Sequence, residues 1–174
     1  MCEHKRSRMK AKKICMIGAF AVGKTSLVRR FVESIFTEKY HTTIGVKISK
    51  KFVESTREPL QMLVWDIEGK DVYTNINVSY LRGASGAMLV VDGTRPDSLE
   101  VADELRALIS DNCGDIPVVL MLNKCDLVDQ WVIGADKITK LEQKVSALFT
   151  SSAKDGKNVD EAFQQLGSLM LDRD

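Results

Sequence analysis

A glycine-rich segment near the start of the chain, GAFAVGKTS (18–26), most narrows what this sequence can fold into. It follows an apolar run, ICMIG (14–18), that is typical of a buried strand, and it opens a segment, 24–33, that is typical of a helix. The pattern G-x-x-x-x-G-K-[ST] is complete and stands in the strand–loop–helix context that gives it meaning. It predicts a loop whose backbone N–H groups bind phosphate at a helix N-terminus. A plain glycine turn capped by threonine is the alternative, but it does not account for the complete motif.

This loop also predicts a metal site. Lys24 would place a full charge near the β- and γ-phosphate oxygens, and the Thr25 hydroxyl would bind Mg²⁺. A second metal-binding residue should come from another strand, and Asp66 ends the apolar run LQMLVWD. We therefore predict that Asp66 binds Mg²⁺ directly or through water, although alone it would be a strand-end cap. The loop residues predicted at the phosphates are Gly18, Ala21, Val22, Gly23, Lys24, Thr25 and Ser26.

Strand-like and helix-like segments alternate along the chain. Further strands are expected at 44–54, 60–67, 86–93, 116–123 and 147–152, the first two as an antiparallel hairpin. Helices are expected at 24–33, from Pro96-Asp97-Ser98 onward, at 134–147 and at 158–171. This alternation predicts an α/β fold with a six-stranded, mostly parallel sheet covered by helices on both faces.

Composition narrows the class of protein. With 174 residues, 44% of them hydrophobic and 28% charged, the chain suits one domain with a substantial core. A net charge of +1 provides no general attraction to nucleic acid. Four scattered cysteines fit reduced thiols better than disulfides or a zinc site. Without a signal peptide or an apolar run of roughly 20 residues, we expect a cytoplasmic monomer that binds no nucleic acid.

Two motifs that follow the last two strands predict the base of a nucleotide. A carboxylate such as Asp126 accepts hydrogen bonds from guanine N1–H and from its exocyclic amine, and adenine offers no such pair. Lys124 would lie along the base plane, and a backbone N–H near Ala153 would contact the guanine carbonyl. The residues predicted to bind guanine are Asn123, Lys124, Asp126, Ser152, Ala153 and Lys154.

The ordered motifs resemble those of the Ras superfamily of small GTPases, most closely its Rab branch. They are GAFAVGKTS (18–26), TTIGV (42–46), WDIEG (65–69), YLRGA (80–84), NKCD (123–126) and SSAK (151–154), and the resemblance covers residues 12–171. It implies a P-loop NTPase G domain with five helices around a six-stranded sheet. It also implies a GTP/GDP switch that uses Mg²⁺ and contacts effector and regulatory proteins through switch I (about 36–46) and switch II (about 66–80).

The resemblance assigns roles to further residues by position. Thr43 would close on Mg²⁺ and the γ-phosphate, Phe36 would pack edge-on against guanine, and Gly69 would give its N–H to the γ-phosphate. Tyr40 and Tyr73 fall at switch positions typical of effector contact, and Tyr40 is also expected at the nucleotide. For each aromatic residue, ordinary packing is the alternative.

Three residues depart from the family pattern at the centre of hydrolysis. Lys70 replaces the glutamine that orients the attacking water, and an ammonium only donates hydrogen bonds; it would pair with a γ-phosphate oxygen instead. Phe20 replaces the usual glycine and would crowd the γ-phosphate and any arginine supplied in trans, which is worth roughly 10³–10⁵ in rate. Glu68, before Gly69, would repel GTP, pair with Lys70 or act as a base on water, and these alternatives stay open.

The pattern of loss resembles that of the hydrolysis-deficient Rnd group of Rho-like proteins, although the replacing residues differ. We therefore predict a guanine-nucleotide switch that is a GTP hydrolase by family but hydrolyses GTP slowly. One alternative is a normally cycling GTPase in which Glu68 or Lys70 has taken over catalysis. Another is a pseudo-GTPase that binds nucleotide weakly and acts as an interaction module. If switch II is displaced, these side chains would instead face solvent.

The two ends of the chain bear on localisation. Six cations stand in the first thirteen residues, so we expect a flexible basic arm at 1–12 and the G domain at 13–174. The arm, with Cys2, would contact anionic membrane weakly, at about 1 kcal/mol per cation; a solvated tail is the alternative. The final residues, LMLDRD, contain no prenylation box, so we expect a cytoplasmic protein with at most peripheral membrane contact.

Overall fold

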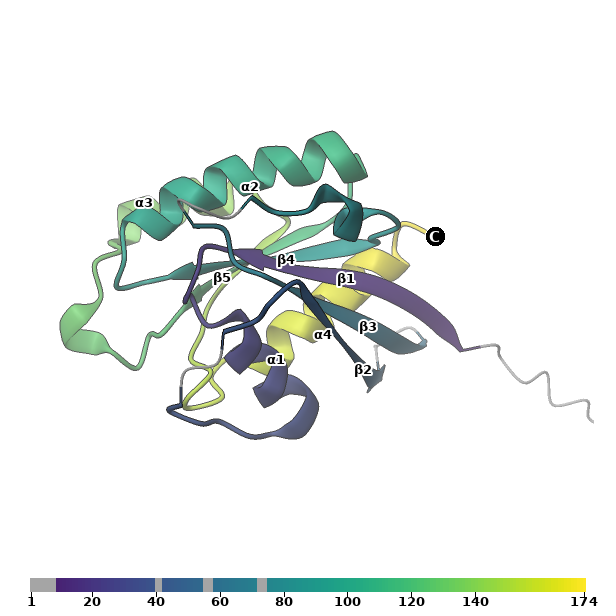
Figure 1. Cartoon of the computed structure of the whole chain (residues 1–174), viewed down its shortest axis with the longest axis horizontal. Helices are drawn as coiled ribbons and strands as arrows, with labels where there is room; N and C mark the ends of the chain where they lie inside the picture. Colours follow the sequence, from purple (N-terminus) through teal and green to yellow (C-terminus); the bar gives the residue numbers. More distant parts are fainter. Residues whose placement is uncertain (1–8, 40–41, 55–57, 72–74) are drawn as a thin grey trace, which may run out of the picture.

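The computed structural model describes residues 9–39, 42–54, 58–71 and 75–174. Its strands are β1 (Lys10–Gly18), β2 (Val46–Glu54), β3 (Pro59–Ile67), β4 (Gly86–Asp92), β5 (Val118–Asn123) and β6 (Ala147–Thr150). Its α-helices are α1 (Lys24–Glu33), α2 (Asp97–Cys113), α3 (Ala135–Glu142) and α4 (Val159–Leu171), and two short 3-10 helices are η1 (Val78–Leu81) and η2 (Val128–Gln130). Figure 1 shows the sheet between α2 and α3 on one side and α1 and α4 on the other.

The strand order in the single sheet is β2-β3-β1-β4-β5-β6. All neighbouring strands are parallel except β2 and β3, which pair antiparallel as predicted for a hairpin. Parallel strands end at the same edge of a sheet, so the loops after β1, β3, β4 and β5 meet there. The α/β class and the mostly parallel, six-stranded sheet are thus confirmed.

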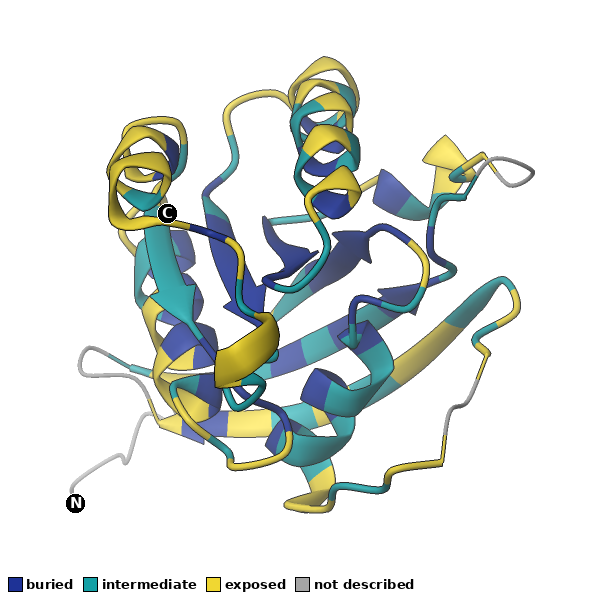
Figure 2. Ribbon diagram, turned by 90° about the vertical axis from the view of Figure 1, so that its left-hand side faces the viewer, coloured by how far each residue is buried: buried dark blue, intermediate teal, exposed yellow. Residues whose placement is uncertain are grey.

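Alternate residues of the central strand β1 build two separate cores. Ile14 and Met16 face the core formed with α1 and α4, whereas Cys15 and Ile17 face the core formed with α2 and α3. The ring of Phe31 on α1 stacks on that of Phe163 on α4, with the ring centroids 3.9 Å apart. Figure 2 shows the resulting dark blue interior along the central strands. A strand buried on both faces needs continuous apolar sequence, which is what β1 and β4 contain.

The helices differ from expectation in number and length. The described residues form four α-helices rather than five, and the turn η1 occupies part of the segment before β4, next to residues 72–74, which lie outside the described residues. The helix expected at 134–147 ends at Glu142. It ends early because Ser146 already pairs with the sheet: its N–H donates to the Val118 carbonyl at 2.9 Å, and its Oγ accepts from the Val118 N–H at 3.1 Å. Across the described ranges, no helix is both long and apolar enough to cross a membrane.

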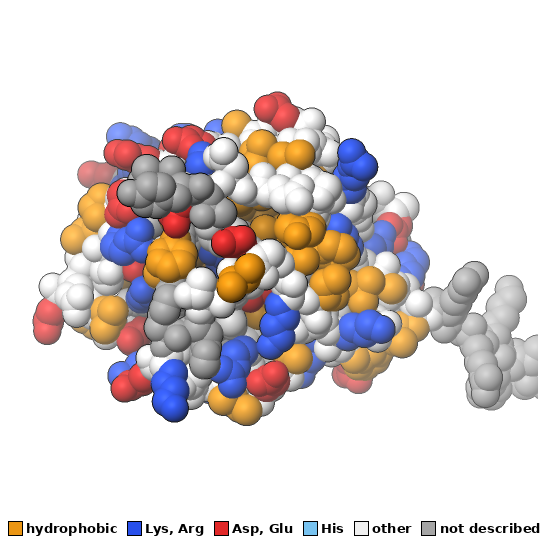
Figure 3. Space-filling model, viewed as in Figure 1, with side chains coloured by type: hydrophobic (Ala, Val, Ile, Leu, Met, Phe, Trp, Pro, Cys, Tyr) orange, Lys and Arg blue, Asp and Glu red, His pale blue; other side chains and the backbone are white. Residues whose placement is uncertain are grey.

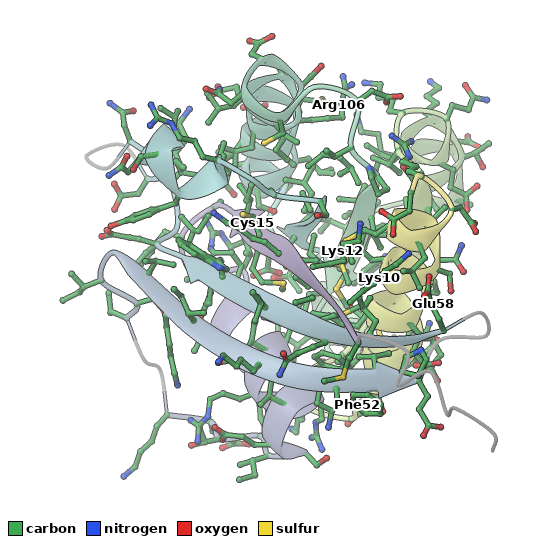
Figure 4. All side chains as sticks on the ribbon, turned by 90° about the vertical axis from the view of Figure 1, so that its right-hand side faces the viewer. Lys10, Lys12, Cys15, Phe52, Glu58 and Arg106 are labelled. Atoms are coloured by element: carbon green, nitrogen blue, oxygen red, sulfur yellow. The ribbon has the colours of Figure 1, made fainter. Side chains whose placement is uncertain are left out.

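Strand β1 begins at Lys10, four residues before the apolar run that predicted it. Lys10 Nζ lies 2.8 Å from Glu58 Oε1 (Figure 4). It also lies 2.8 Å from Asp174 Oδ2, and Lys12 pairs with Asp174 as well. Hydrogen bonds from these lysines lower the pKa of Asp174 to about 2. Residues 10–12, which we assigned to the arm, therefore belong to the sheet. Residues 1–8 lie outside the described residues, so the arm and its membrane contact stay predictions.

Candidate functional site

A cavity of about 350 Å³ opens at the edge where the parallel strands end. This volume is in the range of small-molecule sites, which is about 300–1,000 Å³. The predicted residues that line it are Phe20, Ala21, Gly23, Lys24, Thr25, Ser26, Phe36, Thr43, Gly69, Asn123, Lys124, Asp126, Ala153 and Lys154. The fold therefore brings the phosphate loop, the two motifs predicted to bind the base and residues of the predicted switch segments around one cavity.

Other predicted residues lie behind the lining. Gly18 ends β1, Val22 is fully buried in the core, and Ser152 is fully buried behind the second base motif. Tyr40 lies outside the described residues, as does Tyr73, so their contacts stay predictions.

Several lining residues were missed by sequence reasoning: Arg29, Ile35, Thr37, Glu38, Lys39 and Leu127. Most of them flank a predicted residue, because residues 35–39 surround Phe36 and Leu127 directly follows Asp126. Arg29 stands on α1 one turn after Ser26, so helical spacing could have indicated it.

The phosphate loop holds Lys24 in a buried position. Its side chain is only 6% exposed, and Nζ donates to the carbonyls of Ala19 at 2.8 Å and Gly18 at 3.2 Å. Burial lowers the pKa of Lys24 to about 8, against the opposing attraction of Asp66. A buried ammonium is costly without a nearby anion, so the loop is built to receive negative charge beside this residue.

The loop also needs glycine at 23. Gly23 has φ 101°, a left-handed conformation that side chains disfavour. A Cβ there would lie 2.4 Å from Asn123 Nδ2, so the close approach of the two motifs requires glycine.

The predicted magnesium ligands meet below this loop. Thr25 Oγ1 donates to Asp66 Oδ2 at 2.6 Å and lies 2.6 Å from Thr43 Oγ1. Asp66 is 1% exposed, and its Oδ1 has no hydrogen-bond partner among the described residues. Burial raises the pKa of this carboxyl, and the bond from Thr25 opposes the rise. Mg²⁺ is commonly held by one or two carboxylates together with substrate phosphates and waters, so one buried carboxylate with an unpaired oxygen and two hydroxyls fit it.

Asn123 ties three loops together at the base end of the cavity. Its Nδ2 donates to the Val22 carbonyl of the phosphate loop at 3.0 Å. Its Oδ1 accepts from the Ala153 N–H at 3.3 Å. From the other side, Arg30 of α1 donates through Nε to the Ala153 carbonyl at 2.8 Å. The backbone around Ala153 is thus fixed from two directions.

Ser152 orients the carboxylate predicted to read guanine. Ser152 Oγ donates to Asp126 Oδ1 at 2.8 Å and accepts from the Asp155 N–H at 3.0 Å. Because the hydroxyl has only one proton to donate, its direction is set by these two partners. Asp126 lines the cavity, so the predicted contact with guanine would use the carboxylate oxygen that Ser152 does not bind.

A serine-to-alanine change at 152 tests this arrangement. A hydrogen bond of this kind contributes about 1 kcal/mol, so we expect Ser152→Ala to weaken GDP binding about three- to tenfold. Titration with a fluorescent GDP analogue measures the effect. Ser110→Ala, at an exposed position on α2, should change nothing. If the Ser152→Ala variant and the unchanged protein bind the GDP analogue with equal affinity, Ser152 does not contribute to nucleotide binding.

Two of the three residues that depart from the family pattern, Glu68 and Lys70, each contact another part of the protein. Glu68 Oε2 accepts from the Gly45 N–H at 3.1 Å, and the Glu68 N–H donates to the Gly45 carbonyl at 2.8 Å. Lys70 Nζ pairs with Glu104 on α2 instead. Glu68 and Lys70 therefore do not pair with each other: Glu68 binds Gly45 just before β2, and Lys70 binds Glu104 on α2.

The backbone of this segment lies against the phosphate loop. The Lys70 N–H donates to the Gly18 carbonyl at 3.2 Å, and the Phe20 N–H donates to the Lys70 carbonyl at 3.0 Å. A Cβ on Gly69 would lie 2.7 Å from Phe20 Cα and 2.9 Å from Lys24 Nζ, so only glycine fits. The Phe20 side chain, 38% exposed, stays at the cavity.

Comparison with known proteins agrees with the motifs and the geometry. The model of the Ras family matches residues 13–172. The chain belongs to the Ras family. It is 32% identical over 163 residues to Rab-3C of Bos taurus and of Mus musculus, covering 92% of this chain and 72% of each relative. It is 30% identical to Rab-3A of Homo sapiens, over 92% of this chain and 74% of that protein. This Ras-family chain is thus a Rab-like small GTPase.

Proposed function

We propose that this Ras-family GTPase is a guanine-nucleotide switch that binds GTP and GDP with Mg²⁺ and hydrolyses GTP slowly. Membership of the family supports the switch itself. One observation carries the slow hydrolysis: the two charged residues on either side of Gly69 are bound elsewhere, Glu68 to Gly45 and Lys70 to Glu104.

Binding follows from the residues around the cavity. Lys24 and the N-terminus of α1 attract the phosphates, and Asn123 and Ser152 hold the loops that read the base. Thr25, Thr43 and Asp66 would hold Mg²⁺, which when bound neutralises charge on the β- and γ-phosphate oxygens. Asp126 selects guanine because a base without the matching donors leaves its carboxylate oxygens unpaired in the complex.

Neither Lys70 nor Glu68 is placed to orient the attacking water for GTP hydrolysis. The Lys70 ammonium cannot accept a proton or a hydrogen bond from water, and its pairing with Glu104 turns it toward α2. The Glu68 carboxylate accepts the Gly45 N–H, so it is committed to switch I. The Phe20 ring at the cavity leaves little room for an arginine from an activating protein. Together these contacts favour a protein in which bound GTP keeps its γ-phosphate for a long time.

The proposed partners are effectors and regulators that contact the switch segments and the hairpin between them. Three large hydrophobic side chains on this side are well exposed: Ile44 at 85%, and Ile48 and Phe52 of β2 at 50% each. Figure 3 shows hydrophobic side chains gathered on the face that carries β1, β2 and β3. Exposed apolar clusters of this kind mark protein interaction sites.

The nucleotide carried by the purified protein tests the proposal. The full chain is purified quickly, denatured, and its released nucleotide identified by ion-exchange chromatography. We expect mostly GTP, because binding is intact and cleavage is slow. Mostly GDP would contradict slow hydrolysis unless a GTP titration shows that the site rejects the γ-phosphate. Release of no nucleotide would favour a weakly binding interaction module.

A further inference from the structure

A buried carboxylate outside the predicted motifs lies next to the nucleotide site. Asp92 is the last residue of β4 and is only 1% exposed. Its Oδ2 lies 2.7 Å from Nζ of Lys124, the lysine of the NKCD motif. A charge buried to this degree is tolerated only when it is paired and hydrogen-bonded. The pair therefore joins the end of β4 to the base-reading loop.

The carboxylate of Asp92 is held in place from its other side. Its Oδ1 accepts from the Thr94 N–H at 2.9 Å and from the Thr94 hydroxyl at 2.6 Å. The Asp92 backbone is fixed as well, because Ser98 Oγ donates to its carbonyl at 3.1 Å. With its first oxygen occupied by Thr94, the carboxylate presents its second oxygen to Lys124.

Lys124 in turn connects two parts of the nucleotide site. Its Nζ also donates to the Ala21 carbonyl of the phosphate loop at 3.0 Å, and its side chain lines the cavity. Its backbone has φ 71°, a conformation that residues other than glycine adopt at a cost. Two acceptors, one on β4 and one on the phosphate loop, thus hold the ammonium of Lys124 in place. They do so although the left-handed backbone conformation of Lys124 is unfavourable by itself.

We propose that Asp92 is a positioning residue that fixes Lys124 between the base and the phosphate loop and so sets how long the nucleotide stays bound. The inference rests on the proposed guanine-nucleotide function. Asp92 does not line the cavity; it acts through the ammonium of Lys124. Loss of this positioning should accelerate the release of GDP and GTP alike, because both nucleotides carry the same base and bind the same phosphate loop.

An isosteric change tests the proposal. In Asp92→Asn, the amide oxygen keeps the bonds from Thr94, while the NH₂ group faces the Lys124 ammonium, so two donors meet. Outer partners of this kind are worth roughly 10- to 100-fold where they orient metal ligands, and we expect release about tenfold faster here. The full chain is loaded with a fluorescent GDP analogue, and its release is followed after addition of excess GDP.

Two control variants separate positioning from general stability. Asp103→Asn removes a carboxylate that pairs with Lys144 at 3.5 Å on the surface, and it should leave release unchanged. Thr94→Val removes one bond to Asp92 but leaves the ion pair, so it should lower the melting temperature with less than about a twofold effect on release. Release from folded Asp92→Asn at the unchanged rate would overturn the inference, while nucleotide binding, and hence the proposed function, would stand.

A double variant keeps the test valid if Asp92→Asn does not fold. Lys124→Met removes the ammonium, and Lys124→Met combined with Asp92→Asn removes both charges of the buried pair together. Because Asp92 acts through Lys124, both proteins should release the analogue at the same rate. Faster release from the double variant would show that Asp92 acts by another route and would overturn the inference. Failure of the unchanged protein to retain any analogue would instead reject the proposed function on which it rests.

Discussion

Changing Asp126 to Asn is expected to move the preference of this GTPase from guanine to xanthine nucleotides. Xanthine carries a carbonyl where guanine carries its exocyclic amine, so it requires a donor from the protein. Sites built around a buried hydrogen bond reject the mismatched partner by roughly 10⁴-fold or more, and we expect GTP affinity to fall by about 10³-fold. Competition of GTP and XTP against a fluorescent nucleotide on the Asp126→Asn variant measures both changes.

The structure explains why the NH₂ group of an asparagine introduced in place of Asp126 should face the base. Ser152 Oγ donates to Asp126 Oδ1 at 2.8 Å, and it would hold the amide oxygen of Asn in the same place. The NH₂ group then takes the position of the second carboxylate oxygen, facing the base. Asp129→Asn, an exposed change on η2, serves as the control and should leave the preference for GTP intact. If Asp126→Asn also keeps that preference, the base lies elsewhere.

Restoring Gly at 20 and Gln at 70 together is expected to accelerate GTP hydrolysis about tenfold to a hundredfold. Glutamine both donates and accepts hydrogen bonds, so it can orient water where lysine cannot. Positioned proton acceptors typically contribute about 10²–10⁴ in rate, and an amide that only orients water should give the lower end of that range or somewhat less. The change also breaks the pair with Glu104 and frees the segment from α2. Phosphate release from GTP-loaded Phe20→Gly/Lys70→Gln protein in a single turnover gives the rate.

A matched variant identifies which part of that change matters. Phe20→Gly/Lys70→Met removes the ring and the pair with Glu104 but provides no group to orient water. It should remain as slow as the unchanged protein. Equal acceleration in both variants would assign the block to the Phe20 ring or to the tie with α2. No acceleration in either would place the block at Glu68, which stays bound to Gly45, or elsewhere in the protein.

The parts of the site that sequence predicts well are those encoded in one continuous stretch. The phosphate loop, GAFAVGKTS, and the base motif NKCD carry their geometry in local spacing, and the parallel sheet places both at one edge. The hairpin and both faces of the sheet followed from apolar patterning in the same way.

Contacts between distant segments could not be predicted in this way. The pair between Lys70 and Glu104, which lies 34 positions away on α2, was not predicted, while a contact of Lys70 with the γ-phosphate stays a prediction. The contact of Glu68 with Gly45 depends on where β3 ends and β2 begins, which no spacing encodes. The overlong helix at 134–147 has the same origin, because sheet pairing of Ser146 decides where the chain leaves the helix.

Asp92 was missed for a different reason. It ends the apolar run GAMLVVDG, which we interpreted only as a strand buried on both faces. A charged residue in a fully buried strand requires a partner of opposite charge, so the run itself contained the signal. The identity of that partner, Lys124, depends on the pairing of β4 with β5, which places Asp92 opposite Asn123 and is not encoded in either run alone.

The most direct test of slow hydrolysis is the single-turnover rate of the unchanged protein. The full chain is loaded with GTP labelled in the γ-phosphate, Mg²⁺ is added, and release of labelled phosphate is followed at 25 °C. The contacts of Glu68, Lys70 and Phe20 predict a rate constant well below the intrinsic value for Ras, which is about 3–5 × 10⁻⁴ s⁻¹. A rate at or above that value would show that this GTPase cycles normally and would contradict the account.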